Sequence, residues 1–86
     1  MDISTEFLTD YLLEKGLDWK DFEFLSPIAV QKKDKIIADW RLGNTLNSEV
    51  VNKIFRAFKD LYRNDKPIEG LSYDDFMKAY LNKVNS

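Results

Sequence analysis

The chain has 86 residues, of which 44% are hydrophobic and 33% charged, and its formal net charge is −2. This balance is typical of a single globular domain over residues 1–86 and excludes a disordered or fibrous chain. Because the sequence contains no cysteine and no histidine, disulfides, thiol catalysis and the usual zinc ligands are excluded, and neither a metal nor a cofactor is expected.

Five helix starts repeat one pattern. At each, an apolar residue precedes a Ser, Asp or Asn, and a second apolar residue stands four positions after the polar one, as in a helix N-cap with a hydrophobic staple. The five sets are Ile3, Ser4 and Leu8; Leu17, Asp18 and Phe22; Leu25, Ser26 and Val30; Leu46, Asn47 and Val51; and Leu71, Ser72 and Phe76. Glycine and proline between these sets mark helix ends. The pattern predicts helices over residues 4–15, 18–24, 26–42, 47–63 and 72–84.

The first predicted helix has an apolar side and an acidic side. Its acidic residues, Glu6, Asp10 and Glu14, recur every four positions, and residues 1–23 hold seven acidic and two basic side chains in total. Such a row is typical of a solvated face, because like charges at this spacing repel only weakly. Glu14, however, stands at the helix end, where the dipole disfavours an anion, and this favours a binding role.

The third predicted helix combines inward and outward apolar residues. Ile36, Ile37 and Trp40 share the inward side, whereas Ile28 and Leu42 project away from it. Together with Trp19, which follows the cap of the second helix, these two outward residues are the apolar side chains that a helical core accommodates least well. We therefore expect a partner-binding surface formed by Trp19, Ile28 and Leu42 and edged by the acidic residues of the first helix.

The fourth predicted helix is the most strongly amphipathic. Its apolar residues, from Val50 to Tyr62, fall on one side of a 3.6-residue wheel, so it is expected to form the centre of the core. The opposite side carries Asn52, Lys53, Arg56, Lys59 and Arg63. A basic stripe of this kind suits phosphates or an acidic protein surface, although a solvated face is the simpler interpretation.

The fifth predicted helix supplies another apolar stripe, which consists of Tyr73, Phe76, Met77, Tyr80, Leu81 and Val84. No segment shows the alternating pattern of a β-strand. The sequence thus predicts an all-α fold, a compact orthogonal bundle of about five helices in which the fifth helix packs across the fourth.

The segment between the last two predicted helices resembles the outline of an EF-hand, with Asp75 and Phe76 at its end. A calcium loop requires oxygen ligands at its first, third and fifth positions and glycine at the sixth. Those positions hold Asn64, Lys66, Ile68 and Glu69. Because lysine and isoleucine offer no oxygen ligand, no calcium site is expected here.

The lack of residues for thiol catalysis or metal binding, together with the predicted apolar and acidic surface, favours a non-enzymatic protein that binds another protein. An adaptor, an immunity factor or a phage-encoded inhibitor of a host protein would be of this kind. Nucleic-acid binding through the basic stripe is the first alternative, and a structural subunit of a homo-oligomer is the second. A cytoplasmic location is expected, because no apolar run is long enough to cross a bilayer. The amino-acid usage suggests a phage or a low-GC bacterium.

Overall fold

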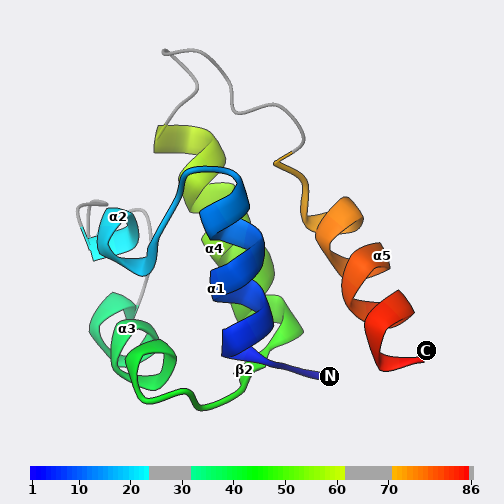
Figure 1. The fold of residues 1–86 in the computed structure, drawn as a ribbon. Coiled ribbons are helices and arrows are strands. Elements are labelled where there is room, and N and C mark those ends of the chain that lie inside the picture. Colours follow the sequence, from blue (N-terminus) through cyan, green and yellow to red (C-terminus); the bar gives the residue numbers. More distant parts are fainter. Residues whose placement is uncertain (24–31, 62–70, 86) are drawn as a thin grey trace.

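The computed structural model describes residues 1–23, 32–61 and 71–85, without the side chains of Trp19, Asp60 and Leu61. This part of the chain forms five helices and one short pair of strands (Figure 1). The helices are α1 (Thr5–Glu14), α2 (Trp19–Glu23), α3 (Lys33–Arg41), α4 (Ser48–Leu61) and α5 (Tyr73–Val84). The strands, β1 (Asp2–Ile3) and β2 (Leu46–Asn47), are antiparallel. The predicted all-helical bundle of five helices is confirmed, and the strand pair is an addition to it.

Three of the predicted N-caps are present, since the side chains of Ser4, Asn47 and Ser72 accept backbone N–H groups at the starts of α1, α4 and α5. Ser4 Oγ accepts the N–H of Phe7 at 3.3 Å, and Ser72 Oγ accepts the N–H of Asp75 at 3.4 Å. At α2 the bond runs the other way, from the N–H of Asp18 to Asp21 Oδ2 at 2.8 Å. Each bond satisfies a backbone N–H at the helix start. The third predicted start, at Ser26, lies outside the described residues.

The strand pair joins the entries of two helices. Ile3 stands opposite Leu46, and both are the apolar residues that precede a cap, at α1 and α4 respectively. Both side chains are buried. The N–H of Ser48 also donates to the carbonyl of Met1 at 2.9 Å. The beginning of the chain is therefore fixed against the start of α4.

The third helix is shorter than the sequence predicts. Instead of spanning residues 26–42 it begins at Lys33, because the preceding residue, Lys32, has φ 59° and ψ 32°. This left-handed backbone cannot continue a right-handed helix and is unusual for a residue other than glycine or asparagine. Residues 26–31 lie outside the described part of the chain. Ile36, Ile37 and Trp40 are buried as predicted.

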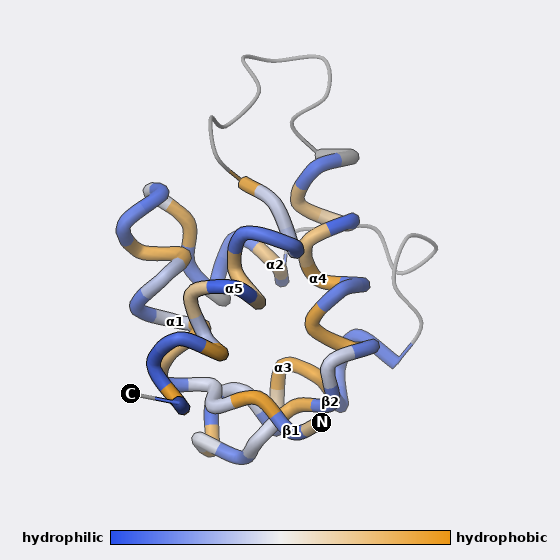
Figure 2. The backbone as a smooth tube through the Cα atoms, turned by 90° about the vertical axis from the view of Figure 1, so that its right-hand side faces the viewer, coloured by the Kyte–Doolittle hydropathy of each residue, from blue (hydrophilic) through white to orange (hydrophobic). Residues whose placement is uncertain are grey.

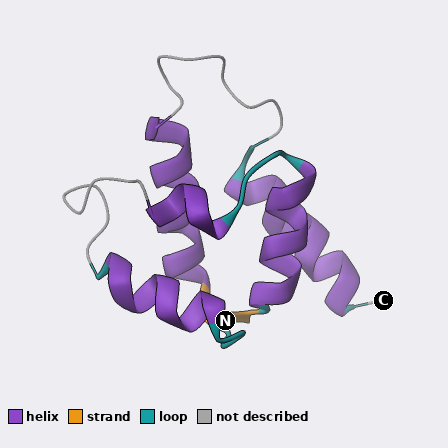
Figure 3. Cartoon of the chain, turned by 60° about the vertical axis from the view of Figure 1, so that its left-hand side comes forward, coloured by secondary structure: helices purple, strands orange, loops and turns teal. Residues whose placement is uncertain are grey.

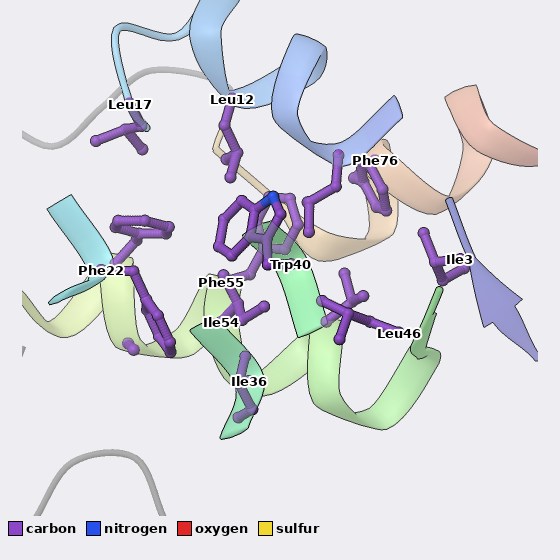
Figure 4. Close-up of a cluster of buried hydrophobic side chains, with 14 of the residues drawn as sticks. Ile3, Leu12, Leu17, Phe22, Ile36, Trp40, Leu46, Ile54, Phe55 and Phe76 are labelled. Carbon is purple, nitrogen blue, oxygen red and sulfur yellow. The ribbon is translucent and has the colours of Figure 1, made fainter. Parts of the chain in front are cut away.

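Helix α4 is the centre of the core, as predicted. Its inward residues are buried, and they are Val51, Ile54, Phe55, Ala57 and Phe58. Helix α3 lies across α4, and α1 and α5 pack on its other side (Figures 2 and 3). The close-up in Figure 4 shows Trp40 between Phe22 and Leu46, with its indole nitrogen turned toward α1.

Aromatic rings pack on both sides of α4. Phe22 of α2 lies 6.1 Å from the ring of Trp40 and 6.0 Å from that of Phe58, between ring centroids. On the other side Phe76 is surrounded by rings from α1, α4 and α5, those of Phe7, Tyr11, Phe55 and Tyr80, at 5.1 to 6.3 Å. Such tilted and edge-on pairs add to the stabilisation from burial.

Helix α5 buries only part of its predicted apolar stripe. Phe76 is fully buried, whereas Leu81 and Val84 are 37% and 57% exposed. The Tyr80 hydroxyl accepts the N–H of Ser4 and donates to the carbonyl of Asp2, both at 3.3 Å. The second half of α5 is therefore tied to the first segment of the chain by Tyr80 and by Lys83, whose Nζ lies 5.1 Å from the centroid of the Phe7 ring. None of the described helices is long and apolar enough to cross a membrane.

Candidate protein-binding surface

Three carboxylates line one side of α1 and form what we call the acidic face: Glu6, Asp10 and Glu14. All three side chains are exposed. They stand one helical turn apart and so project in the same direction. Among the described residues none of them has an ion-pair partner. The acidic face predicted from the sequence is therefore present, and no described residue forms an ion pair with it.

An open groove of about 320 Å³ lies beside the acidic face. Helix α1 contributes one wall and the C-terminal end of α3 with the turn that follows contributes the other, so we call it the α1–α3 groove. Its lining residues are Ser4, Thr5, Glu6, Thr9 and Asp10 from the first segment and Trp40, Gly43 and Thr45 from the second. The structure thus brings Glu6 and Asp10 to a concave site, whereas Glu14 lies outside it.

Hydrogen bonds fix the walls of this groove to one another. The indole N–H of Trp40 donates to Thr9 Oγ1 at 2.7 Å, and Thr9 Oγ1 donates to the carbonyl of Thr5 at 2.8 Å. Trp40 is only 3% exposed. Because a buried aromatic side chain held by such a bond has one orientation, the groove keeps its shape without a ligand.

Thr5 is the one buried polar residue of the described part of the chain whose side-chain oxygen has no hydrogen-bond partner. Thr5 borders the groove, but the residue is only 3% exposed and its hydroxyl oxygen is buried. Buried polar atoms are nearly always hydrogen-bonded in folded proteins, so an exception calls for a physical reason.

Of the three apolar side chains predicted to form the partner-binding surface, the structure describes only that of Leu42. Its side chain is 75% exposed, and it directly precedes Gly43 of the groove. Trp19 begins α2, but its side chain lies outside the described part, as does all of Ile28. The grouping of Leu42 with these two residues therefore stays a prediction. Its place next to the groove supports a link with Glu6 and Asp10.

The basic stripe is also present on the surface. Lys53, Arg56 and Lys59 are exposed and have no ion-pair partner among the described residues, Asn52 is half-buried, and Arg63 lies outside them. A second open groove, of about 410 Å³, lies between this part of α4 and the start of α5. Asp74 also lines it, so a carboxylate opposes the positive charge there.

The Tyr11 hydroxyl has a shifted pKa. Burial raises the pKa of the Tyr11 hydroxyl, and the negative charges of Asp75 and Glu14 raise it further. The hydroxyl is not nucleophilic at neutral pH, because the shift holds its proton more tightly. Over the residues described, no three acidic side chains are placed to hold a metal ion.

Sequence patterns did not reveal most of the groove. Thr5, Thr9 and Thr45 carry no distinctive spacing, and Trp40 was expected only as a core residue. The one available signal is the pair Thr5 and Thr9, which stand one turn apart on the same helix as Glu6 and Asp10. The contact of Thr9 with Trp40 depends on how α3 lies against α1, which no local pattern encodes.

The chain matches no protein-family model, no curated protein and no solved structure.

Proposed function

We propose that this protein is a non-enzymatic binding module whose acidic face docks on a basic surface of a partner protein. The observation that carries the proposal is the row of three exposed carboxylates, Glu6, Asp10 and Glu14, without ion-pair partners in the described structure and beside an open groove. Complementary charge of this kind speeds the encounter of two proteins and selects against partners of like charge.

Leu42 supplies an apolar contact next to this charge. A leucine that is 75% exposed is one large hydrophobic side chain that docking would remove from water. Protein–protein interfaces usually have an apolar core and a polar or charged rim. An adaptor, an immunity factor or a phage-encoded inhibitor acting in the cytoplasm would each use such a surface.

The proposal is tested by capturing partners from a lysate of the organism that encodes the chain, with nuclease present. Three baits are compared: the wild type, the acidic-face variant E6Q/D10N/E14Q and the matched basic variant K53Q/R56Q/K59Q. We expect a stoichiometric protein that the wild type and the basic variant retain. The acidic-face variant should bind it about tenfold more weakly, since exposed charge pairs contribute ~0.2–1 kcal/mol each. Equal capture by all three baits would contradict the proposal.

Nucleic-acid binding through α4 is the second candidate. It is supported by the exposed side chains of Lys53, Arg56 and Lys59, which have no ion-pair partner among the described residues. If it is the function, capture disappears with nuclease and with the basic variant, and affinity for a duplex falls steeply as salt is raised.

A second copy of this chain also offers a basic surface to the acidic face, namely the stripe on α4. In that case the mass of the pure wild type in solution rises with concentration. Each charge variant alone lowers that association, and mixing the two variants restores a one-to-one complex, because each variant supplies the charged surface that the other lacks.

A further inference from the structure

One side of α5 carries a line of apolar side chains that the described elements leave largely uncovered. Its members, Tyr73, Met77, Leu81 and Val84, follow one another at intervals of about one helical turn, so they project in the same direction. Leu81 and Val84 are 37% and 57% exposed, and Figure 1 shows α5 at the edge of the molecule. A continuous apolar line on an outer helix is typical of an interaction surface.

Two side chains of opposite charge border this line. Asp74 directly follows Tyr73 and Lys78 directly follows Met77, so the acid and the base stand one turn apart along the same edge. Both are exposed, and neither has an ion-pair partner among the described residues. An edge of this kind is complementary to a copy of itself that runs in the opposite direction, because the acid of each copy then meets the base of the other.

The groove between α4 and the start of α5 leaves this side of the helix accessible. It has a volume of about 410 Å³, and Leu71, Tyr73 and Asp74 form part of its α5 wall. Arg56 and Lys59 form part of the α4 wall, yet neither forms an ion pair with Asp74 in the described structure. The carboxylate that borders the apolar line is therefore available to a base from another molecule.

We infer that two copies of this chain associate through α5, with the apolar line of one helix packed antiparallel against that of the other. The register that sets Asp74 of each copy beside Lys78 of the other also sets Leu81 beside Leu71, so the charged and the apolar contacts agree. A parallel pair would set like charges against each other. The contact uses no residue of the acidic face and is independent of the proposed function. Because one short helix supplies most of it, the dimer exchanges with the monomer.

Sedimentation velocity of the pure protein over a wide range of concentrations tests the association. We expect the average mass of the wild type to rise toward that of a dimer. L81Q/V84Q should weaken the association at least about tenfold, because it removes two apolar side chains from the contact without changing the charge. The matched control L13Q/L42Q alters two exposed leucines elsewhere on the surface and should associate as the wild type does.

Exchange of the two charges tests the antiparallel register. D74K and K78D should each weaken the association about tenfold, since each turns two attractive charge pairs into repulsive ones. The double variant D74K/K78D restores both pairs with their signs reversed, so it should associate within about threefold of the wild type. A general defect caused by either substitution would add up in the double variant instead of cancelling.

A single cysteine gives a second, direct measurement. The chain contains no cysteine, and Met77 lies close to the midpoint of the inferred register. With oxidised glutathione present, M77C should therefore form a disulfide-linked dimer. N82C places the thiol on another, exposed side of α5 and should remain largely unlinked under the same conditions.

A wild type that stays monomeric at every concentration would overturn the inference. A dimer that L81Q/V84Q leaves intact, or a double charge variant that associates no better than D74K and K78D do alone, would also overturn it. If E6Q/D10N/E14Q abolishes the association, the second copy binds through the acidic face and the α5 contact is wrong. Circular dichroism of each variant establishes that the helices are retained.

Discussion

The indole N–H of Trp40 donates a 2.7 Å hydrogen bond to Thr9 Oγ1, across 31 residues of chain. Thr9→Val keeps the size of the side chain and removes the acceptor. Because Trp40 is buried, its N–H would be left without a partner, and we expect the free energy of unfolding to fall by about 1–3 kcal/mol. Urea unfolding followed by tryptophan fluorescence measures the change.

Thr45→Val is the matched control for this substitution, since Thr45 is exposed and its change should cost less than ~0.5 kcal/mol. Equal losses for the two variants would show that the bond between Trp40 and Thr9 contributes nothing specific.

Thr5→Val is expected to act in the opposite direction. The Thr5 hydroxyl is buried without a partner among the described residues, so the folded protein bears the cost of removing it from water. Replacing the hydroxyl by a methyl group should raise the free energy of unfolding by about 1 kcal/mol. Urea unfolding measures whether the free energy of unfolding rises or falls. A loss of stability would mean that this hydroxyl has a partner in solution.

Tyr80→Phe removes two hydrogen bonds between α5 and the beginning of the chain. The Tyr80 hydroxyl bonds to the backbone of Ser4 and Asp2, both at 3.3 Å, while its ring packs on Phe7 and Phe76. The variant keeps the ring, so we expect a loss of only about 0.5–1.5 kcal/mol. Amide hydrogen exchange should accelerate at Ser4. Unchanged exchange there would contradict the proposed role of the hydroxyl.

Phe76→Ala should come close to unfolding the protein. Phe76 is fully buried among four other rings, and its removal is expected to cost about 3–5 kcal/mol. A chain of this length has a net stability of ~4–13 kcal/mol, so the loss is a large share of the total. Thermal unfolding followed by circular dichroism measures it. Leu81→Ala on the same helix, where the side chain is 37% exposed, should cost clearly less.

Tyr11 makes stability depend on pH at the alkaline end. Burial, and then the charges of Asp75 and Glu14, raise its pKa above 10.0, so the folded state keeps the hydroxyl proton to higher pH than the unfolded state does. The resulting stabilisation is complete below pH 10.0 and is lost as pH rises through the raised pKa. Unfolding by urea on both sides of that pH should show a steeper decline for the wild type than for Tyr11→Phe. Parallel declines would contradict the shift.

The helix entries were predictable because their signals are local. Ile3 with Leu8 and Leu46 with Val51 are apolar pairs on either side of a cap, and all four side chains are buried as the staple requires. The strand pair between Ile3 and Leu46 was not predictable, since two-residue strands are too short to show an alternating pattern.

Other features depend on contacts that no short pattern encodes. Lys32 adopts a left-handed conformation that its side chain does not favour, so the helix was expected to begin earlier. Leu81 and Val84 continue the stripe of Phe76 on α5, yet no described element covers them. For the surface, the acidic face could be predicted because its residues share one helix. The groove could not, because Trp40 and Thr45 reach it from a distant segment.

Phe55 and Phe58, three residues apart on α4, belong to the two aromatic clusters on either side of that helix. Both clusters are anchored on the same turn of α4, so neither can become disordered without disturbing the other. Denaturation should therefore be cooperative, with fluorescence from the tryptophan side and tyrosine absorbance from the α5 side following one transition. A fragment that ends before α4 would lack rings for both sides.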